Sequence, residues 1–281
     1  MTQEPLEFLP LEGWCELQSA FKKDWPRGIS GYSVLEIQRQ WATKGIDYDF
    51  KVYCPFGDVK NGMVAVNEKN DFYEIIIQCP SDDTENLRDA LRKTKFIDWK
   101  RSIIVPYAPH NVIECIKKLV QDIDVEIRLI LPSETFILEA KSPFYKDVNL
   151  PPSVIFDLIS MDHLDIINST WPHRYPNSSS YFQLLINTKF GYGLFVNNTL
   201  ISWVFINESG NLLHMYTIEE FRKKGYAALL LKLVSNILLK DGKDVSAYCL
   251  IDNVNACKLY KNAGFVRSDG VAWCYLNSTL K

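Results

Sequence analysis

Hydrophobic positions follow two periods along this chain, alternation in short runs and helical spacing in longer ones, and the two kinds of run are interleaved. A strand-like run over residues 212–217 leads through the basic turn 222–227 into a long helix that ends near Gly242. Before it, two β-runs meet at Asn197 and Asn198, and so short a connection predicts an antiparallel pair. The pattern therefore predicts an α/β protein with a mixed sheet.

Further elements are predicted on both sides of this passage. In the second half the predicted helices lie near 161–169, after the Trp171 loop up to about residue 187, and over 253–264. The predicted strands there cover residues 192–196, 200–207, 244–251, 265–268 and 271–277. In the first half they are two helices around Trp25, strands over 49–54, 62–67, 72–80, 102–107 and 124–131, and helices over 84–94 and 111–121.

Two segments half a chain apart share one order of features. Each has an amphipathic helix, a Trp-Pro pair with a basic residue close behind, a loop, a second helix and then a β-run. The tryptophans are Trp25 and Trp171, which lie 146 residues apart in a chain of 281. We therefore predict two copies of one fold, residues 1–145 and 150–281, with a linker within 141–152. The alternative is that two unrelated α/β domains share such fragments.

The basic turn has the features of an anion site. The first N–H groups of a helix have no partner within the helix, and the helix dipole favours negative charge there. Gly225 allows a close approach to the backbone, while Arg222, Lys223 and Lys224 add positive charge, so the expected ligand is a pyrophosphate. The alternative is a solvated basic turn. The corresponding segment of the first half, residues 81–90, is acidic and has no glycine, so only the second copy is expected to bind an anion.

Composition narrows the class of protein. A net charge of −3 argues against general nucleic-acid binding, and no apolar run approaches the roughly 20 residues that cross a membrane. Seven cysteines without C-x-x-C spacing are expected to be reduced packing groups, and four scattered histidines predict no metal site. The start of the sequence lacks the pattern of a signal peptide. A cytoplasmic location is expected, with the mitochondrion as the alternative.

Two motifs together resemble one family. Arg222, Gly225 and Ala227 match the R/Q-x-x-G-x-G/A acyl-CoA signature, and the segment from Asn253 to Phe265 matches N-x-x-A-x-x-L-Y-x-x-x-G-F. The pair is similar to the GCN5-related N-acetyltransferases, the GNAT superfamily. The tandem layout resembles the glycine N-acyltransferase-like family of invertebrates, in detail over about residues 160–277 and only in topology before them. The resemblance implies tandem GNAT folds, a degenerate N-terminal copy and an intact acyl-CoA site in the C-terminal one.

The resemblance also implies roles for individual residues. In the family, the strand before the turn pairs with the pantetheine arm, and a backbone N–H there stabilises the oxyanion. Tyr260 would protonate the departing thiolate, and the loop after the first helix would border the acceptor. The acyl-CoA site is expected at Met215, Tyr216, Thr217, Arg222, Lys223, Lys224, Gly225, Tyr226, Ala227, Asn253, Ala256 and Tyr260. The catalytic candidates are Tyr260, Asn211 and Thr217, and the substrate candidates are Trp171, His173 and Arg174.

Each role has a structural alternative. Asn253 is also a typical helix N-cap, and Tyr260 is also typical of a tyrosine in the protein core. The loop that begins at Trp171 is equally compatible with a corner that only packs against the rest of the protein.

One position departs from the family. Relatives carry a glutamate base on the strand before the turn, and the matching position here is Asn211, which cannot take a proton. His214 is close, but alternation predicts that it faces away from Asn211 and Met215 unless a bulge intervenes. Glu208, at the edge of the preceding turn, is a base that would act through water.

The predicted function is transfer of an acyl group from acetyl-CoA or another acyl-CoA to a small amine, with glycine or another amino acid as the candidate acceptor. Transfer is expected by direct attack in a ternary complex. The predicted partners are thus small molecules. The alternative is a non-catalytic acyl-CoA-binding or scaffold protein of the same fold, which the asparagine at 211 favours.

Overall fold

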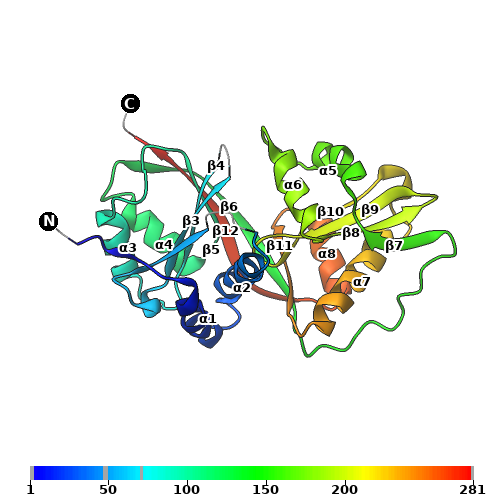
Figure 1. Cartoon of the computed structure of the whole chain (residues 1–281), viewed down its shortest axis with the longest axis horizontal. Helices are drawn as coiled ribbons and strands as arrows, with labels where there is room; N and C mark the ends of the chain where they lie inside the picture. Colours follow the sequence, from blue (N-terminus) through cyan, green and yellow to red (C-terminus); the bar gives the residue numbers. More distant parts are fainter. Residues whose placement is uncertain (1–2, 47–49, 70–71, 280–281) are drawn as a thin grey trace. The chain divides into compact units, whose positions relative to one another are not determined.

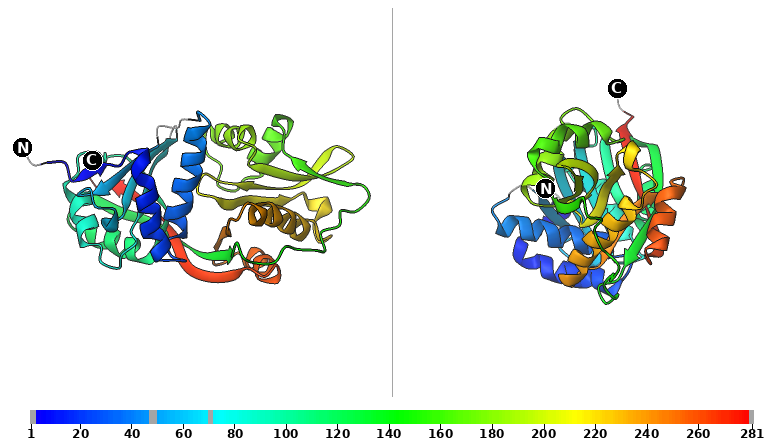
Figure 2. Two further views of the ribbon diagram at one scale, coloured as in Figure 1. Left: turned by 60° about the horizontal axis from the view of Figure 1, so that its bottom comes forward. Right: turned by 90° about the vertical axis from the view of Figure 1, so that its right-hand side faces the viewer.

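The computed structural model describes residues 3–46, 50–69 and 72–279 of the chain. It divides into two compact units. Unit 1 comprises Met1–Glu134 and Ser268–Lys281, and unit 2 comprises Thr135–Arg267. Each unit is a mixed sheet with helices packed on it (Figures 1 and 2).

Unit 1 is built mainly from the first half of the chain. Its elements are β1 (Leu6–Phe8), α1 (Trp14–Lys23), α2 (Ile29–Thr43), β2 (Lys51–Pro55), β3 (Met63–Lys69), β4 (Phe72–Gln78), α3 (Glu85–Lys93), β5 (Ile103–Pro109), α4 (His110–Leu119) and β6 (Val125–Leu138). Short 3-10 turns cover Leu11–Gly13 and Val59–Asn61. Its strand order is β1-β2-β3-β4-β5-β12-β6, where β12 is the last strand of the chain, Val266–Ser278. The pairing of β4 with β5 is parallel.

Unit 2 carries the two sequence motifs. Its elements are β7 (Val154–Leu158), α5 (Leu164–Thr170), α6 (Ser178–Asn187), β8 (Gly191–Val196), β9 (Thr199–Ile206), β10 (Asn211–Thr217), α7 (Tyr226–Lys240), β11 (Val245–Leu250) and α8 (Val254–Asn262), with 3-10 turns at Met161–His163 and Glu219–Phe221. The strand order is β7-β8-β9-β10-β11-β6, and the part of β6 from Thr135 to Leu138 belongs to this unit. Strands β7 to β10 pair antiparallel, whereas β10 and β11 are parallel.

The two halves of the chain run through the same succession of elements, strand, two helices, three strands, helix, strand, helix and strand. The predicted duplication is therefore confirmed at the level of element order. The predicted antiparallel pair is β8 with β9, and Asn197 and Asn198 both have the positive φ that a tight hairpin turn needs. The short strands β1 and β7 were not predicted, and Asp49, the first residue of one predicted strand, lies outside the described residues.

The last strand differs most from expectation. The two predicted runs at 265–268 and 271–277 are one strand, β12, and its residues from Ser268 onward belong to unit 1. There it pairs antiparallel with β5 over Val271 to Leu276. The boundary of the sequence repeat therefore differs from that of the compact units. The repeat follows the order of elements along the chain, whereas the units are defined by contacts in space. The division into residues 1–145 and 150–281 stays a prediction about the repeat.

Helix α7 is fixed in place because its inner face packs against the sheet. Its fully buried residues, which include Leu230, Leu231 and Val234, recur at helical spacing and pack in one core with β8, β9 and β10. Helices α5 and α6 cover the other face of the unit 2 sheet (Figures 1 and 2). The end of β10 and the start of α7 are therefore anchored independently of the turn that joins them.

Candidate functional site

The turn between β10 and α7 is an open helix N-terminus. Gly225 is the N-cap of α7 in a left-handed conformation, φ 85° and ψ −2°, and Lys223 before it also has a positive φ, 61°. The amide of Leu229 donates to the carbonyl of Gly225 at 3.0 Å, so the amides of the three residues before it face the turn. A Cβ added at Gly225 would meet nothing within 4 Å. Backbone donors are thus reachable from outside, as a phosphate ligand requires.

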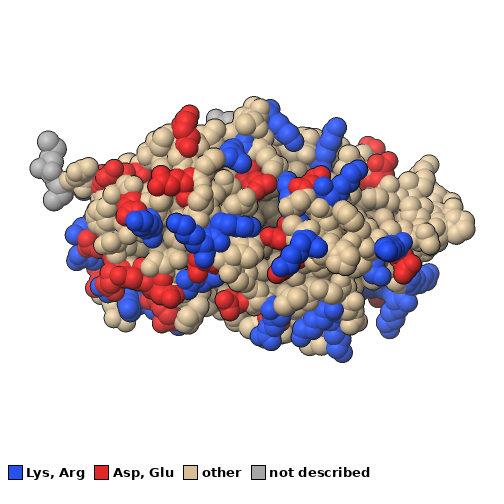
Figure 3. All heavy atoms as spheres, turned by 90° about the horizontal axis from the view of Figure 1, so that it is seen from below, with Lys and Arg blue, Asp and Glu red and all other residues tan. Residues whose placement is uncertain are grey.

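The basic side chains of the turn do not all serve the same purpose. Arg222 donates from Nε to the carbonyl of Thr217 at 2.9 Å, and its guanidinium lies 5.1 Å from the centre of the Tyr216 ring. It therefore ties the end of β10 to the turn. Lys223 and Lys224 are exposed. On the face drawn in Figure 3, Lys and Arg side chains form separate groups with Asp and Glu side chains among them.

Strands β10 and β11 separate as they approach this turn. Among the described residues their Cα pairing is confined to Asn211 with Ser246 and Leu212 with Ala247. From Leu213 onward, β10 continues beside β9 alone. The edge of β10 that faces β11 is then able to pair with an extended ligand, as an added strand would.

Asn211 stands at the point where the strands part. It is buried, its amide Nδ2 donates to the carbonyl and the Oγ of Ser209 at 3.0 Å each, and its Oδ1 accepts from the Oγ of Ser246 at 2.6 Å. These bonds hold β10 against β11 before they diverge. The side chain acts here as a structural clamp, and a direct part in catalysis stays a prediction.

Strand β10 contains a bulge between Leu213 and Tyr216. The pairing with β9 advances three residues along β10, from Leu213 to Tyr216, but only two along β9, from Phe205 to Trp203. The extra residue is accommodated at His214, which has φ 50°. A bulge is the exception under which strand alternation does not determine the face of His214, and the structure contains it.

The bulge determines which way His214 faces. Its ring lies 5.3 Å from Phe182 of α6 and 5.9 Å from Trp203 of β9, on the face that α5 and α6 cover. Met215 instead packs with the core cluster beneath α7. The only sequence signal for this change is the pair of adjacent apolar residues, Leu212 and Leu213, which interrupts the alternation.

The Trp171 loop reaches the same place. Trp171 lies 5.0 Å from Phe182, 6.0 Å from Tyr181 and 6.5 Å from His214, measured between ring centres. Arg174 is exposed and donates to the carbonyl of Ser169 at 3.0 Å, which closes the C-terminal end of α5. Of the predicted substrate residues, Arg174 therefore has a capping role, whereas Trp171 belongs to an aromatic cluster. This cluster consists of Trp171, Tyr181, Phe182, Trp203 and His214.

His173 and Glu208 lie at the margin of this cluster. The ring of His173 lies 6.2 Å from that of Trp171, and partial desolvation of this exposed residue lowers its pKa. Glu208 is buried, and its carboxylate accepts a hydrogen bond from the hydroxyl of Tyr181. Glu208 lies in the turn before β10, as expected, and Tyr181 covers its carboxylate; its part as a base that acts through water stays a prediction.

Tyr260 and Asn253 occupy helix α8. Asn253 is its N-cap, with the side chain accepting from the amide of Ala256 at 3.2 Å, which confirms the capping alternative. Tyr260 is buried, stacked at 5.4 Å on Phe136, and burial raises its pKa. It therefore keeps its proton at neutral pH. Its part as a proton donor stays a prediction.

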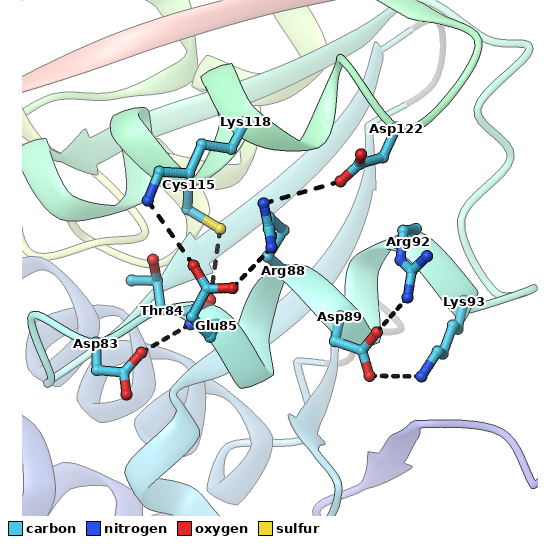
Figure 4. Close-up of polar contacts among 10 residues, drawn as sticks. All are labelled: Asp83, Thr84, Glu85, Arg88, Asp89, Arg92, Lys93, Cys115, Lys118 and Asp122. Carbon is cyan, nitrogen blue, oxygen red and sulfur yellow. Dashed lines mark hydrogen bonds and ion pairs between the residues drawn. The ribbon is translucent and has the colours of Figure 1, made fainter.

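The matching helix start in unit 1 is closed by acidic groups (Figure 4). The carboxylate of Asp83 accepts from the amide of Glu85 at 3.0 Å, and Glu85 pairs with Arg88 at 2.7 Å. Asp82 is hydrogen-bonded to Arg27, which lowers the pKa of its carboxyl group. The Asp83 carboxylate thus satisfies one helix amide, and the three carboxylates add negative charge where α7 leaves its donors open. The first copy would therefore repel a phosphate.

Elsewhere in the described residues there is no disulfide, no cluster of metal ligands and no helix that could span a membrane. All seven cysteines lie within these residues and are free thiols, six of them buried. In residues 3–46, 50–69 and 72–279, no three His, Cys, Asp or Glu side chains converge as a metal ion would need. Among the helices of the described chain, none is long and apolar enough to span a membrane.

Comparisons with known proteins support the fold of the chain. Residues 191–274 match the family model of FR47-like protein, and no curated protein matches the chain. A Drosophila protein solved by X-ray crystallography superimposes with a TM-score of 0.84 at 17% identity, over 99% of this chain and 100% of the other.

Two further solved structures carry the superfamily in their descriptions. A tandem GNAT protein from the clavulanic acid biosynthesis pathway gives a TM-score of 0.60 at 11% identity, over 98% and 99% of the two chains. A GCN5-related N-acetyltransferase-like protein from Streptococcus suis gives 0.51 at 13% identity, over 95% and 98%. This chain therefore has the GNAT acetyltransferase fold, in a tandem arrangement.

Proposed function

From this fold and site we propose that the chain is an acyl-CoA-dependent N-acyltransferase, which moves the acyl group of acetyl-CoA or another acyl-CoA to a small amine. Glycine or another amino acid is the acceptor that the sequence resemblance favours. The observation that carries the proposal is the path of β10, which leaves β11 after Leu212 and runs to the open helix start at Gly225.

That path suits the two parts of coenzyme A. The pyrophosphate would accept hydrogen bonds from the amides at the start of α7, with Lys223 and Lys224 beside it. The pantetheine arm would extend along the free edge of β10. Five residues of strand, from Leu213 to Thr217, span about 16 Å. The thioester would then lie near the bulge, within the aromatic cluster around Trp171.

The reaction needs three groups at that end. Attack by the amine nitrogen on the thioester carbonyl forms the C–N bond, and the developing oxyanion would be stabilised by a backbone N–H of Met215 to Thr217. Collapse of the intermediate breaks the C–S bond. Tyr260 would protonate the leaving thiolate, since it retains its proton at neutral pH. The amine must also lose a proton, and Asn211 cannot accept it.

The alternative of a non-catalytic acyl-CoA-binding protein rests on that last point. The two are separated by measuring release of free thiol from acetyl-CoA and from benzoyl-CoA in the presence of a panel of primary amines. We expect amine-dependent thiol release with formation of the amide. Binding of acyl-CoA by calorimetry without turnover of any amine would favour the binding protein.

A further inference from the structure

The bulge in β10 places a histidine where the proposed reaction lacks a base. We propose that His214 is the general base of the acyl transfer, accepting at Nδ1 the proton that the attacking amine loses. The inference rests on the proposed function, and it supplies the group that Asn211 does not.

The hydrogen bonds of His214 leave one ring nitrogen in the required state. Nε2 lies 2.9 Å from the carbonyl oxygen of Ile167 and 3.5 Å from the Oγ1 of Thr170. A carbonyl oxygen only accepts, so Nε2 carries the proton and Nδ1 of the neutral ring has the lone pair. Both contacts come from α5, on the side away from the strand. This is the arrangement by which a histidine base is held in one tautomer.

Burial keeps the ring neutral before the reaction. It lowers the pKa of His214 to about 4, against a smaller opposing effect of the Ile167 carbonyl and with a further lowering by His173. At neutral pH the lone pair is therefore available. The other ionisable groups that face this region are Tyr216 on β10 and the hydrogen-bonded pair of Tyr181 and Glu208.

A base of such low proton affinity suits removal of the proton after attack. The neutral amine forms the C–N bond, and the nitrogen becomes cationic and strongly acidic while the carbonyl oxygen becomes negative. The N–H proton then moves to Nδ1, the C–S bond breaks, and the thiolate takes a proton from its own donor. The imidazolium finally loses its proton to solvent and the donor of the thiolate regains one from solvent, which restores both groups to their starting states.

His214 also lies at the right point along β10. It occupies the bulge itself, at the far end of the free edge from Gly225, where the thioester of a bound acyl-CoA would lie. Bulges next to active sites commonly re-aim a side chain in this way. Its positive φ is uncommon for a residue other than glycine, and the surrounding contacts hold it there.

The test uses the full chain with His214→Gln, in which the amide keeps a donor for the Ile167 carbonyl but has no base at the Nδ1 position. We expect amine-dependent turnover to fall by roughly 10²- to 10⁴-fold and the acid limb of the kcat–pH profile to disappear. Acyl-CoA affinity by calorimetry should stay within about twofold. His110→Gln, an exposed histidine of unit 1, is the matched control and should behave as the parent chain.

A second variant guards against a folding defect. His214→Gly removes the ring at a backbone conformation that glycine adopts without strain. Imidazole added to this variant should restore turnover in a concentration-dependent way.

The outcomes are distinguishable. If the parent chain turns over no amine, the proposed function fails. If the parent is active and His214→Gln retains its rate and acid limb, or Glu208→Gln loses them instead, only the assignment of His214 is overturned.

Discussion

Gly225→Asp is expected to weaken the binding of acetyl-CoA by roughly 5- to 150-fold, because it adds a carboxylate at the open end of α7. The added side chain has space, since a Cβ at this position meets nothing within 4 Å. Repulsion between unit charges about 5 Å apart is about 1 kcal/mol in water and about 3 kcal/mol near a protein surface, which corresponds to that range in Kd.

Gly225→Asn isolates the charge from the backbone change. Asparagine has nearly the same shape as aspartate and tolerates the left-handed conformation that Gly225 adopts, φ 85°. We therefore expect most of the loss in affinity to appear between the asparagine and aspartate variants. The difference should shrink as ionic strength rises, because exposed charges are screened.

Gly242 provides a matched control at the opposite end of the same helix. It also has a positive φ, 70°, and open space around its Cβ position. Its distance from Gly225 along α7 is about 25 Å, well beyond the Debye length of about 10 Å at 0.1 M salt. Gly242→Asp and Gly242→Asn should therefore bind acetyl-CoA equally. Equal affinities of Gly225→Asp, Gly225→Asn and the parent chain in isothermal titration would refute the anion site.

Three further predictions concern the core of unit 2. Tyr260→Phe keeps the stacking on Phe136 and should lower kcat by about 10²-fold while the Kd of acyl-CoA stays unchanged; an unaltered kcat would mean that Tyr260 only packs. Asn211→Ala should lower the free energy of unfolding by about 1–3 kcal/mol in urea denaturation, since the buried Ser246 hydroxyl loses its acceptor; an unchanged midpoint would contradict the clamp. Finally, the lowered pKa of His214 means that the unfolded chain binds its proton more readily, so stability is full above pH 6.5 and falls as pH drops toward 4. The free energy of unfolding is expected to fall by about 3 kcal/mol over this range. If the free energy of unfolding of the His214→Gln chain depends equally steeply on pH, His214 is not the cause.

The amino-acid sequence by itself determined the local parts of this molecule. The Trp-Pro repeat and the order of apolar runs predicted a duplicated α/β chain, and the duplication is present in the element order. Gly225 before an apolar helix and Asn253 as an N-cap were also readable, because each depends on the conformation of a few consecutive residues. Spacing within one element survives folding unchanged.

Only the tertiary structure decided the features that depend on partners distant in the sequence. The last strand pairs with β5, more than 150 positions earlier in the chain, and alternation within the strand is equally compatible with any neighbour. The bulge opposite β9 turns His214 toward α5 and α6, although strict alternation predicts a different face. A bulge depends on the register between two paired strands, so the residue pattern of one strand does not reveal it.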